Sequence, residues 1–91
     1  MTSLVLYDFY SPSCHPCKTI LPHLEKIATD FPQVKLRKVD VNKEPGLATQ
    51  FAVTSLPSLA LMNGKVLWSA SGYTPHMITS LRNKIYEALS S

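Results

Sequence analysis

The chain has 91 residues, of which 45% are hydrophobic, and it carries nine basic and six acidic side chains for a formal net charge of +3 at pH 7. This length predicts one small domain over residues 1–91, with enough apolar side chains for a core. The basic residues are scattered, and their one cluster, residues 35–38, alternates like a solvated strand, so we do not expect nucleic-acid binding.

The sequence predicts no export or membrane segment. The N-terminus lacks the basic region of a signal peptide, and no stretch approaches the roughly 18–20 apolar residues of a membrane span. We therefore expect a cytoplasmic protein without membrane contact. In that compartment, two cysteines three positions apart favour redox chemistry or metal binding over a structural cross-link.

The first half of the chain predicts a strand, a helix and a second strand. Residues 4–10 are almost continuously apolar, which is typical of a central strand buried on both faces. After a turn at 11–13, a helix is expected from about Cys14–Pro16 to Asp30, with Pro16 in its first turn and a kink at Pro22. Residues 34–41 alternate as a second strand.

The second half predicts a short helix, a hairpin and a last helix. Asn42 is expected to cap a helix over about 43–51, and residues 58–62 read as a third strand. Asn63-Gly64 predicts a hairpin to a fourth strand over 65–70. Thr74 is expected to cap the last helix. The expected fold class is α/β, β-α-β-α-β-β-α, with a four-stranded mixed sheet flanked by three helices on both faces.

The only two cysteines, Cys14 and Cys17, lie at the junction between the first predicted strand and the first predicted helix. A dithiol at this spacing and place is suited to making and breaking a disulfide. A closed zinc site needs four ligands, and the chain offers only this pair with His15, His23 and His76 and no second CxxC. We therefore expect no metal within one chain, while a cluster shared between two chains stays open.

The two cysteines are expected to have different roles. Cys14 is at a helix N-terminus, where unpaired N–H groups and the helix dipole favour a thiolate, so we expect it to be the exposed nucleophile. Cys17 is one turn further in and more buried, which makes it the resolving thiol. Exchange then runs through a mixed disulfide on Cys14 that Cys17 attacks.

Asp8 interrupts the apolar first strand. A carboxylate there is costly unless it is paired or functional. Burial should raise its pKa and let it act as a general base near neutral pH. The alternative is a structural Asp8 that is satisfied, or paired with Lys38 on the adjacent strand, and the two readings are compatible.

Residues 8–18, D-F-Y-S-P-S-C-H-P-C-K, resemble the D-F-W-A-x-W-C-G-P-C-K run of the thioredoxin family. The resemblance covers nearly the whole chain and also rests on Pro22, residues 38–42 (K-V-D-V-N), residues 56–58 (L-P-S), Asn63-Gly64 and Gly72. It implies a minimal thioredoxin fold and a thiol–disulfide oxidoreductase that reduces protein disulfides. The implied partners of this monomer are a thioredoxin reductase or similar electron donor and disulfide-containing proteins, with no cofactor beyond the Cys14–Cys17 disulfide.

The resemblance also implies roles for further residues. It places Asp8 beneath Cys17, where it would help to remove the thiol proton through a water, with Lys38 as its partner. It implies a cis bond before Pro57, in a loop that lies against the dithiol and pairs with an extended target segment. The implied target-binding groove consists of Leu56, Pro57, Pro16, Gly72 and Tyr73. From its place between a glycine and a helix cap, we expect Tyr73 to be exposed.

Three departures from the family pattern affect the expected behaviour. Ser13 replaces a tryptophan and His15 replaces a glycine. Because residues 4–10 are already the active-site strand, we expect the family's first strand and helix to be absent. His15 has two interpretations: a protonated imidazole that stabilises the Cys14 thiolate and makes the disulfide more oxidising, or a solvated side chain with little effect.

Two other classes of protein fit the sequence less well. A glutathione-linked glutaredoxin typically has C-P-Y-C, T-V-P and G-G-x-D, where this chain has C-H-P-C, S-L-P and G-Y-T, so a thioredoxin-like protein is favoured. A non-catalytic binding module on the same fold is disfavoured by the intact cysteine pair together with Asp8.

Overall fold

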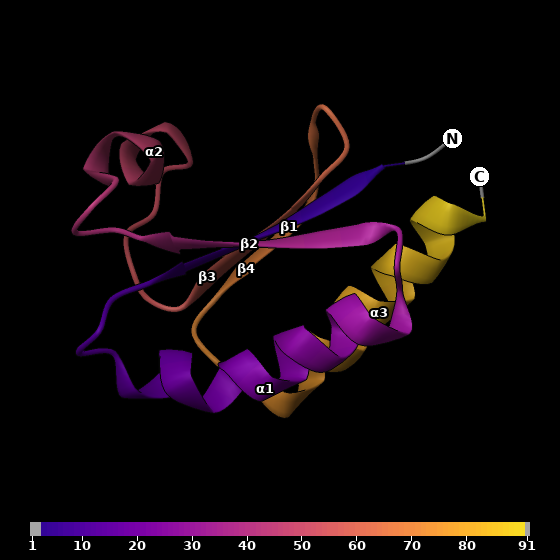
Figure 1. The fold of residues 1–91 in the computed structure, drawn as a ribbon, viewed down its shortest axis with the longest axis horizontal. Coiled ribbons are helices and arrows are strands. Elements are labelled where there is room, and N and C mark those ends of the chain that lie inside the picture. The colour runs from indigo at the N-terminus through magenta and orange to yellow at the C-terminus, as the bar shows by residue number, and fades with distance from the viewer. Residues whose placement is uncertain (1–2, 91) are drawn as a thin grey trace.

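The computed structural model describes residues 3–90 and contains four strands and three helices (Figure 1). The elements are β1 (Leu4–Tyr10), α1 (His15–Asp30), β2 (Val34–Asp40), α2 (Pro45–Gln50), β3 (Ser58–Met62), β4 (Val66–Ser71) and α3 (Pro75–Leu89). The strands form one sheet in the order β2-β1-β3-β4, with β1 parallel to β2 and the other neighbours antiparallel. The predicted element order and mixed sheet are confirmed.

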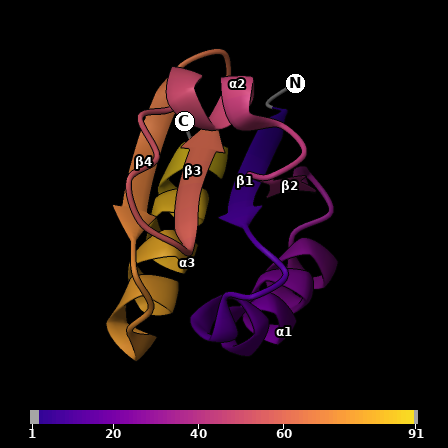
Figure 2. The same ribbon diagram turned by 90° about the vertical axis from the view of Figure 1, so that its left-hand side faces the viewer.

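The helices cover the two faces of the sheet unequally. Helices α1 and α3 lie on one face and the short α2 lies on the other (Figures 1 and 2). The main core fills the space between the sheet and the two long helices. Its buried members are Leu4, Leu6, Ile20, Leu24, Ile27, Phe31, Val34, Leu59, Leu61, Met77, Leu81 and Ile85.

Strand β1 is buried completely on only one of its faces. Its alternation sends Leu4, Leu6 and Asp8 towards the long helices, and all three are buried. On the α2 face, Phe9 is buried while Tyr7 is half-buried, and their rings lie 5.1 and 4.9 Å from that of Phe51, centroid to centroid. The predicted burial on both faces therefore holds where α2 covers the strand.

The start of α2 differs from the prediction. Asn42 does not cap this helix, which begins at Pro45 with Glu44 at the cap position and no side-chain cap bond. Instead, the Asn42 N–H donates to Asp40 Oδ1 at 2.9 Å, and the N–H groups of Lys43 and Glu44 donate to the Asp40 carbonyl at 3.0 and 2.9 Å. Asp40 thus forms a turn with these donors, which delays the helix.

The hairpin is confirmed, but its loop has three residues. Met62 pairs with Val66 and the register shifts between Leu61 and Met62, so β4 spans Val66–Ser71 where 65–70 was predicted. Gly64 has φ +95°, a conformation that glycine adopts without strain. The cap of α3 is confirmed, because Thr74 Oγ1 accepts the Met77 N–H at 3.3 Å. Within residues 3–90, no helix has the length and hydropathy needed to span a membrane.

Ala52, just after α2, has φ +54° and is the one non-glycine residue with a positive φ between residues 3 and 90. An L-residue is disfavoured in this left-handed region, which helix ends usually fill with glycine. We expect Ala52→Gly to raise the free energy of unfolding by about 0.5–1 kcal/mol, measured by urea denaturation, because relief of strain exceeds the entropy lost to a more flexible unfolded chain.

Ala48→Gly is the matched control, because Ala48 lies inside the same helix. It should lower the free energy of unfolding by about 1 kcal/mol. If both substitutions destabilise the protein alike, Ala52 is not strained.

Candidate dithiol active site

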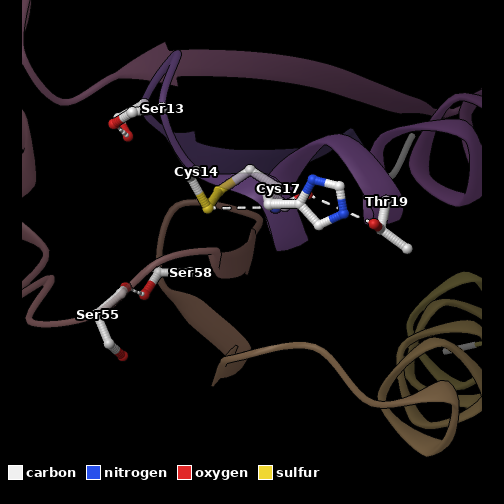
Figure 3. Close-up of a disulfide and its surroundings, with 8 residues drawn as sticks. Ser13, Cys14, Cys17, Thr19, Ser55 and Ser58 are labelled. Carbon is white, nitrogen blue, oxygen red and sulfur yellow. Dashed lines mark hydrogen bonds between the residues drawn. A yellow bond between two sulfur atoms is a disulfide. The ribbon is translucent and has the colours of Figure 1, made fainter.

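The dithiol lies at the junction of β1 and α1. After β1 ends at Tyr10, the Cys14 N–H donates to the Ser11 carbonyl at 3.1 Å and closes the turn. Cys14 has extended backbone angles and occupies the N-cap position of α1, with Pro16 in the first turn. Cys14 and Cys17 form a disulfide, with their Cα atoms 5.3 Å apart (Figure 3). The local sequence therefore places both sulfur atoms at the helix N-terminus.

The two sulfur atoms have different surroundings. Cys14 is half-exposed, whereas Cys17 is only 4% exposed. The Cys17 N–H donates to Cys14 Sγ at 3.2 Å, the bond that a capping oxygen usually accepts. A thiolate on Cys14 would gain from this donor and from the positive end of the α1 dipole. The geometry favours attack by Cys14 and protection of Cys17.

Asp8 lies behind the buried cysteine. Its side chain is 2% exposed, and it is the register partner of Lys38 on the parallel strand β2. A small cavity of about 130 Å³ adjoins Asp8, Lys38 and Cys17 together. Its remaining lining residues are Tyr10, Ser11, Pro12, Lys18 and Leu21. At about 30 Å³ per molecule, the cavity has room for a few waters in contact with residues of both its Asp8 and its Cys17 side.

The Asp8 carboxyl has an unusual protonation equilibrium. Burial raises its pKa from 3.8 to about 6, and the positive charge of Lys38 opposes part of this rise. In the described part of the chain, Asp8 Oδ1 has no hydrogen-bond partner, and no ion pair within 4 Å joins it to Lys38. Lys38 therefore acts on Asp8 by charge at a distance. A carboxyl with this pKa can take up and release a proton near neutral pH.

A proline loop lies beside the dithiol. The Leu56–Pro57 bond is cis, as the resemblance implied, with Pro57 buried and Leu56 half-buried. Figures 2 and 3 place this loop, with Ser55 and Ser58, next to the N-terminus of α1. Gly72 follows β4 with φ +77°, and its N–H donates to the Pro57 carbonyl at 2.8 Å. Three segments that are distant in sequence thus meet around the disulfide.

Tyr73 is half-buried, so the expectation of an exposed side chain is wrong. Its ring packs against the core and stacks on His23 of α1, with centroids 6.0 Å apart and planes at 26°. Tyr73 Oη and His23 Nε2 are 3.3 Å apart, within hydrogen-bond distance. Sequence reasoning assigned no role to His23, because no local pattern links residues 50 positions apart.

The remaining predicted positions are at the surface. His15 and Pro16 are exposed beside Cys14, and Ser13 is exposed with its Oγ 3.3 Å from Ser11 Oγ. Over residues 3–90, no group of three or more His, Cys, Asp or Glu side chains is placed to hold a metal ion. Because residue 13 is a serine, no aromatic ring is present at this position beside the dithiol.

Fold and site together define a class: a dithiol at a helix N-terminus on a mixed four-stranded sheet, opposite a cis-proline loop. The family model described as Thioredoxin matches residues 1–85. The chain therefore belongs to the thioredoxin family.

Known relatives agree with this assignment. The chain is 40% identical over 83 residues to the thioredoxin of Haemophilus influenzae, an alignment that covers 89% of this chain and 76% of that protein. It is 43% identical over 60 residues to the thioredoxin of Chlamydia trachomatis, covering 66% of this chain but only 59% of that protein. The chain thus spans less than two thirds of the length of some curated relatives.

Solved structures show the same fold. The thioredoxin of Trypanosoma brucei brucei superposes with a TM-score of 0.86 at 34% identity, covering 99% of this chain and 78% of that one. The thioredoxin of Fasciola hepatica gives a TM-score of 0.84 at 32% identity, covering 96% and 82%. Because these relatives are thioredoxins, the comparisons favour a thioredoxin over the glutaredoxin alternative.

Proposed function

We propose that this protein is a thiol–disulfide oxidoreductase that reduces disulfides in other proteins. The observation that carries the proposal is the Cys14–Cys17 disulfide at the N-terminus of α1, with Cys14 half-exposed and Cys17 buried. A structural cross-link does not need this asymmetry, whereas sequential exchange requires one thiol that targets reach and one that they do not.

The reaction proceeds from the reduced dithiol. The Cys14 thiolate attacks one sulfur of the target disulfide, forms a mixed disulfide and releases the other target sulfur as a thiolate. Cys17 then loses its proton to the Asp8 carboxylate through water in the adjoining cavity and attacks Cys14 Sγ. The Cys14–Cys17 disulfide forms, the second target sulfur leaves, and two electrons have passed to the target.

Lys38 and the groove residues support this chemistry. The charge of Lys38 keeps the Asp8 pKa from rising further, so that a large fraction of Asp8 is a carboxylate at neutral pH. The target segment lies between Pro16 and the proline loop and pairs with the backbone before Pro57. The groove as a whole consists of Leu56, Pro57, Pro16, Gly72 and Tyr73.

His15 tunes the potential in this proposal. It is exposed directly beside Cys14, and an imidazolium there would stabilise the thiolate and so the reduced form. The disulfide is then somewhat more oxidising than the roughly −270 mV of thioredoxin. A measured reduction potential clearly below that value would mean that His15 does not make the disulfide more oxidising.

The protein works as a cytoplasmic monomer, takes electrons from a thioredoxin reductase or similar donor, and uses no redox group other than its own dithiol. The match to the Thioredoxin family model and the similarity to curated thioredoxins support this assignment.

The test measures insulin disulfide reduction under two electron supplies. One contains NADPH and thioredoxin reductase, and the other contains NADPH, glutathione and glutathione reductase. We expect turnover only with the first, and none from Cys14→Ser. Turnover only with glutathione would indicate a glutaredoxin-like enzyme. Silence in both, with no redox change in the thiols, would indicate a binding module.

A further inference from the structure

The short segment 72–74 is held at three successive residues. The Gly72 N–H donates to the Pro57 carbonyl at 2.8 Å, Tyr73 contacts His23, and Thr74 Oγ1 caps α3. Each bond goes to a different part of the fold: the proline loop, α1 and α3. The segment therefore connects the proline loop opposite the dithiol to α1, the helix that carries the dithiol.

The contact between Tyr73 and His23 joins segment 72–74 to α1. The side chains meet by ring stacking and by the 3.3 Å approach of Tyr73 Oη to His23 Nε2. His23 lies six positions after Cys17 on α1, or about 9 Å along the helix axis at 1.5 Å per residue. Because α1 is one continuous helix from His15 to Asp30, with Pro22 inside it, a contact at His23 constrains the position of its N-terminus relative to Gly72 and Pro57.

We propose that His23 and Tyr73 are positioning residues that set the distance between the dithiol helix and the proline loop, and so select protein disulfides over small ones. A protein target must contact Cys14 and the Pro57 loop at the same time, so it depends on their spacing. A small disulfide needs only the Cys14 sulfur. This inference rests on the proposed reductase function and adds a determinant of its substrate preference.

The test compares two substrates in single-turnover reactions of the reduced protein. Insulin is the protein disulfide, and 5,5′-dithiobis(2-nitrobenzoate) is the small one. Tyr73→Phe keeps the ring and removes the hydrogen bond, whereas His23→Ala removes both interactions from an exposed position where loss of folding is not expected. His76→Ala is the matched control, since His76 is also an exposed histidine at a helix position.

We expect Tyr73→Phe to lower the second-order rate constant for insulin about fivefold, the equivalent of one net hydrogen bond of about 1 kcal/mol. His23→Ala should lower it at least as much, and the double variant should be no worse than His23→Ala, because the two residues act through one contact. His23→Gln, which keeps a hydrogen-bonding group, should recover part of the rate. In His23→Ala and His23→Gln, the rate constant for the small disulfide should stay unchanged.

Two results would overturn the inference. One is an unchanged insulin rate in both His23→Ala and Tyr73→Phe. The other is an equal fall for both substrates, which would indicate a general effect on the dithiol. If the wild-type protein reduces neither substrate, the proposed function itself fails, so the two failures are distinguishable.

Discussion

Serine in place of Cys17 is expected to leave a protein that attacks its target but does not release it. Cys14 keeps its helix N-terminus and the Cys17 position keeps its backbone N–H, so the mixed disulfide still forms. Without the buried thiol, no internal sulfur can attack Cys14 Sγ, and turnover should disappear. Mass spectrometry under non-reducing conditions should show a stoichiometric adduct with a disulfide-containing protein, which dithiothreitol releases.

Cys14→Ser is the matched control for this trap. Its remaining thiol is buried, with 4% of Cys17 exposed, so it should form little adduct and show no turnover. An equal yield of adduct from the two variants would mean that the assignment of nucleophile and resolving thiol is wrong.

Replacing Asp8 with alanine is expected to stabilise the protein at neutral pH while slowing it. The folded state raises the pKa of Asp8 from 3.8 to about 6, so the native protein binds this proton more tightly than the unfolded chain. Native stability therefore falls as the pH rises from about 4 to 6, and the full penalty remains above that window. The shift of about 2 pKa units corresponds to about 3 kcal/mol.

Chemical denaturation at several pH values measures this effect. The unfolding free energy of Asp8→Ala minus that of the wild type should increase by about 3 kcal/mol between pH 3.5 and pH 7.5. Asp40→Ala is the control, because buried Asp40 accepts a hydrogen bond from Asn42 and its loss should cost about 1 kcal/mol at pH 7. A pH-independent difference for Asp8→Ala would contradict the raised pKa.

The same variant separates stability from catalysis. Without the carboxylate, Cys17 loses its general base, so release of the target from the mixed disulfide should slow about 10²-fold at neutral pH. The deficit should shrink at alkaline pH, where thiols ionise without a base. An equal slowing at every pH would place the role of Asp8 elsewhere.

Local patterns in the sequence predict most of the fold. The apolar run of β1, the helical spacing of Ile20, Leu24 and Ile27, and the Asn63-Gly64 turn act over a few residues, so they can be read directly. The position of the dithiol follows in the same way, because a strand end and a helix start flank it. The burial of the Asp8 carboxyl could also be predicted, because Asp8 lies within an otherwise apolar strand.

Predictions from the sequence failed where two residues compete for the same backbone N–H groups or where the local sequence carries no signal. Asn42 was expected to cap α2, but the Asp40 side chain takes the Asn42 N–H and the helix starts at Pro45. Asp and Asn both favour turns and caps, so the local sequence does not show whether Asp40 forms a turn or Asn42 caps the helix. Ala52 gave no signal of its positive φ, because alanine does not mark the left-handed region in a sequence as glycine does.

The sequence by itself therefore determined the strand-turn-helix unit that holds Cys14 and Cys17, along with the aspartate in the strand before it. Tertiary structure alone decided what faces this unit: the cavity shared by Asp8, Lys38 and Cys17, and the contact of Tyr73 with His23 across 50 positions. The reason is physical. Backbone propensity and hydrophobic period act between near neighbours in the chain, whereas burial, pKa and side-chain stacking depend on which distant segments the packed core brings together.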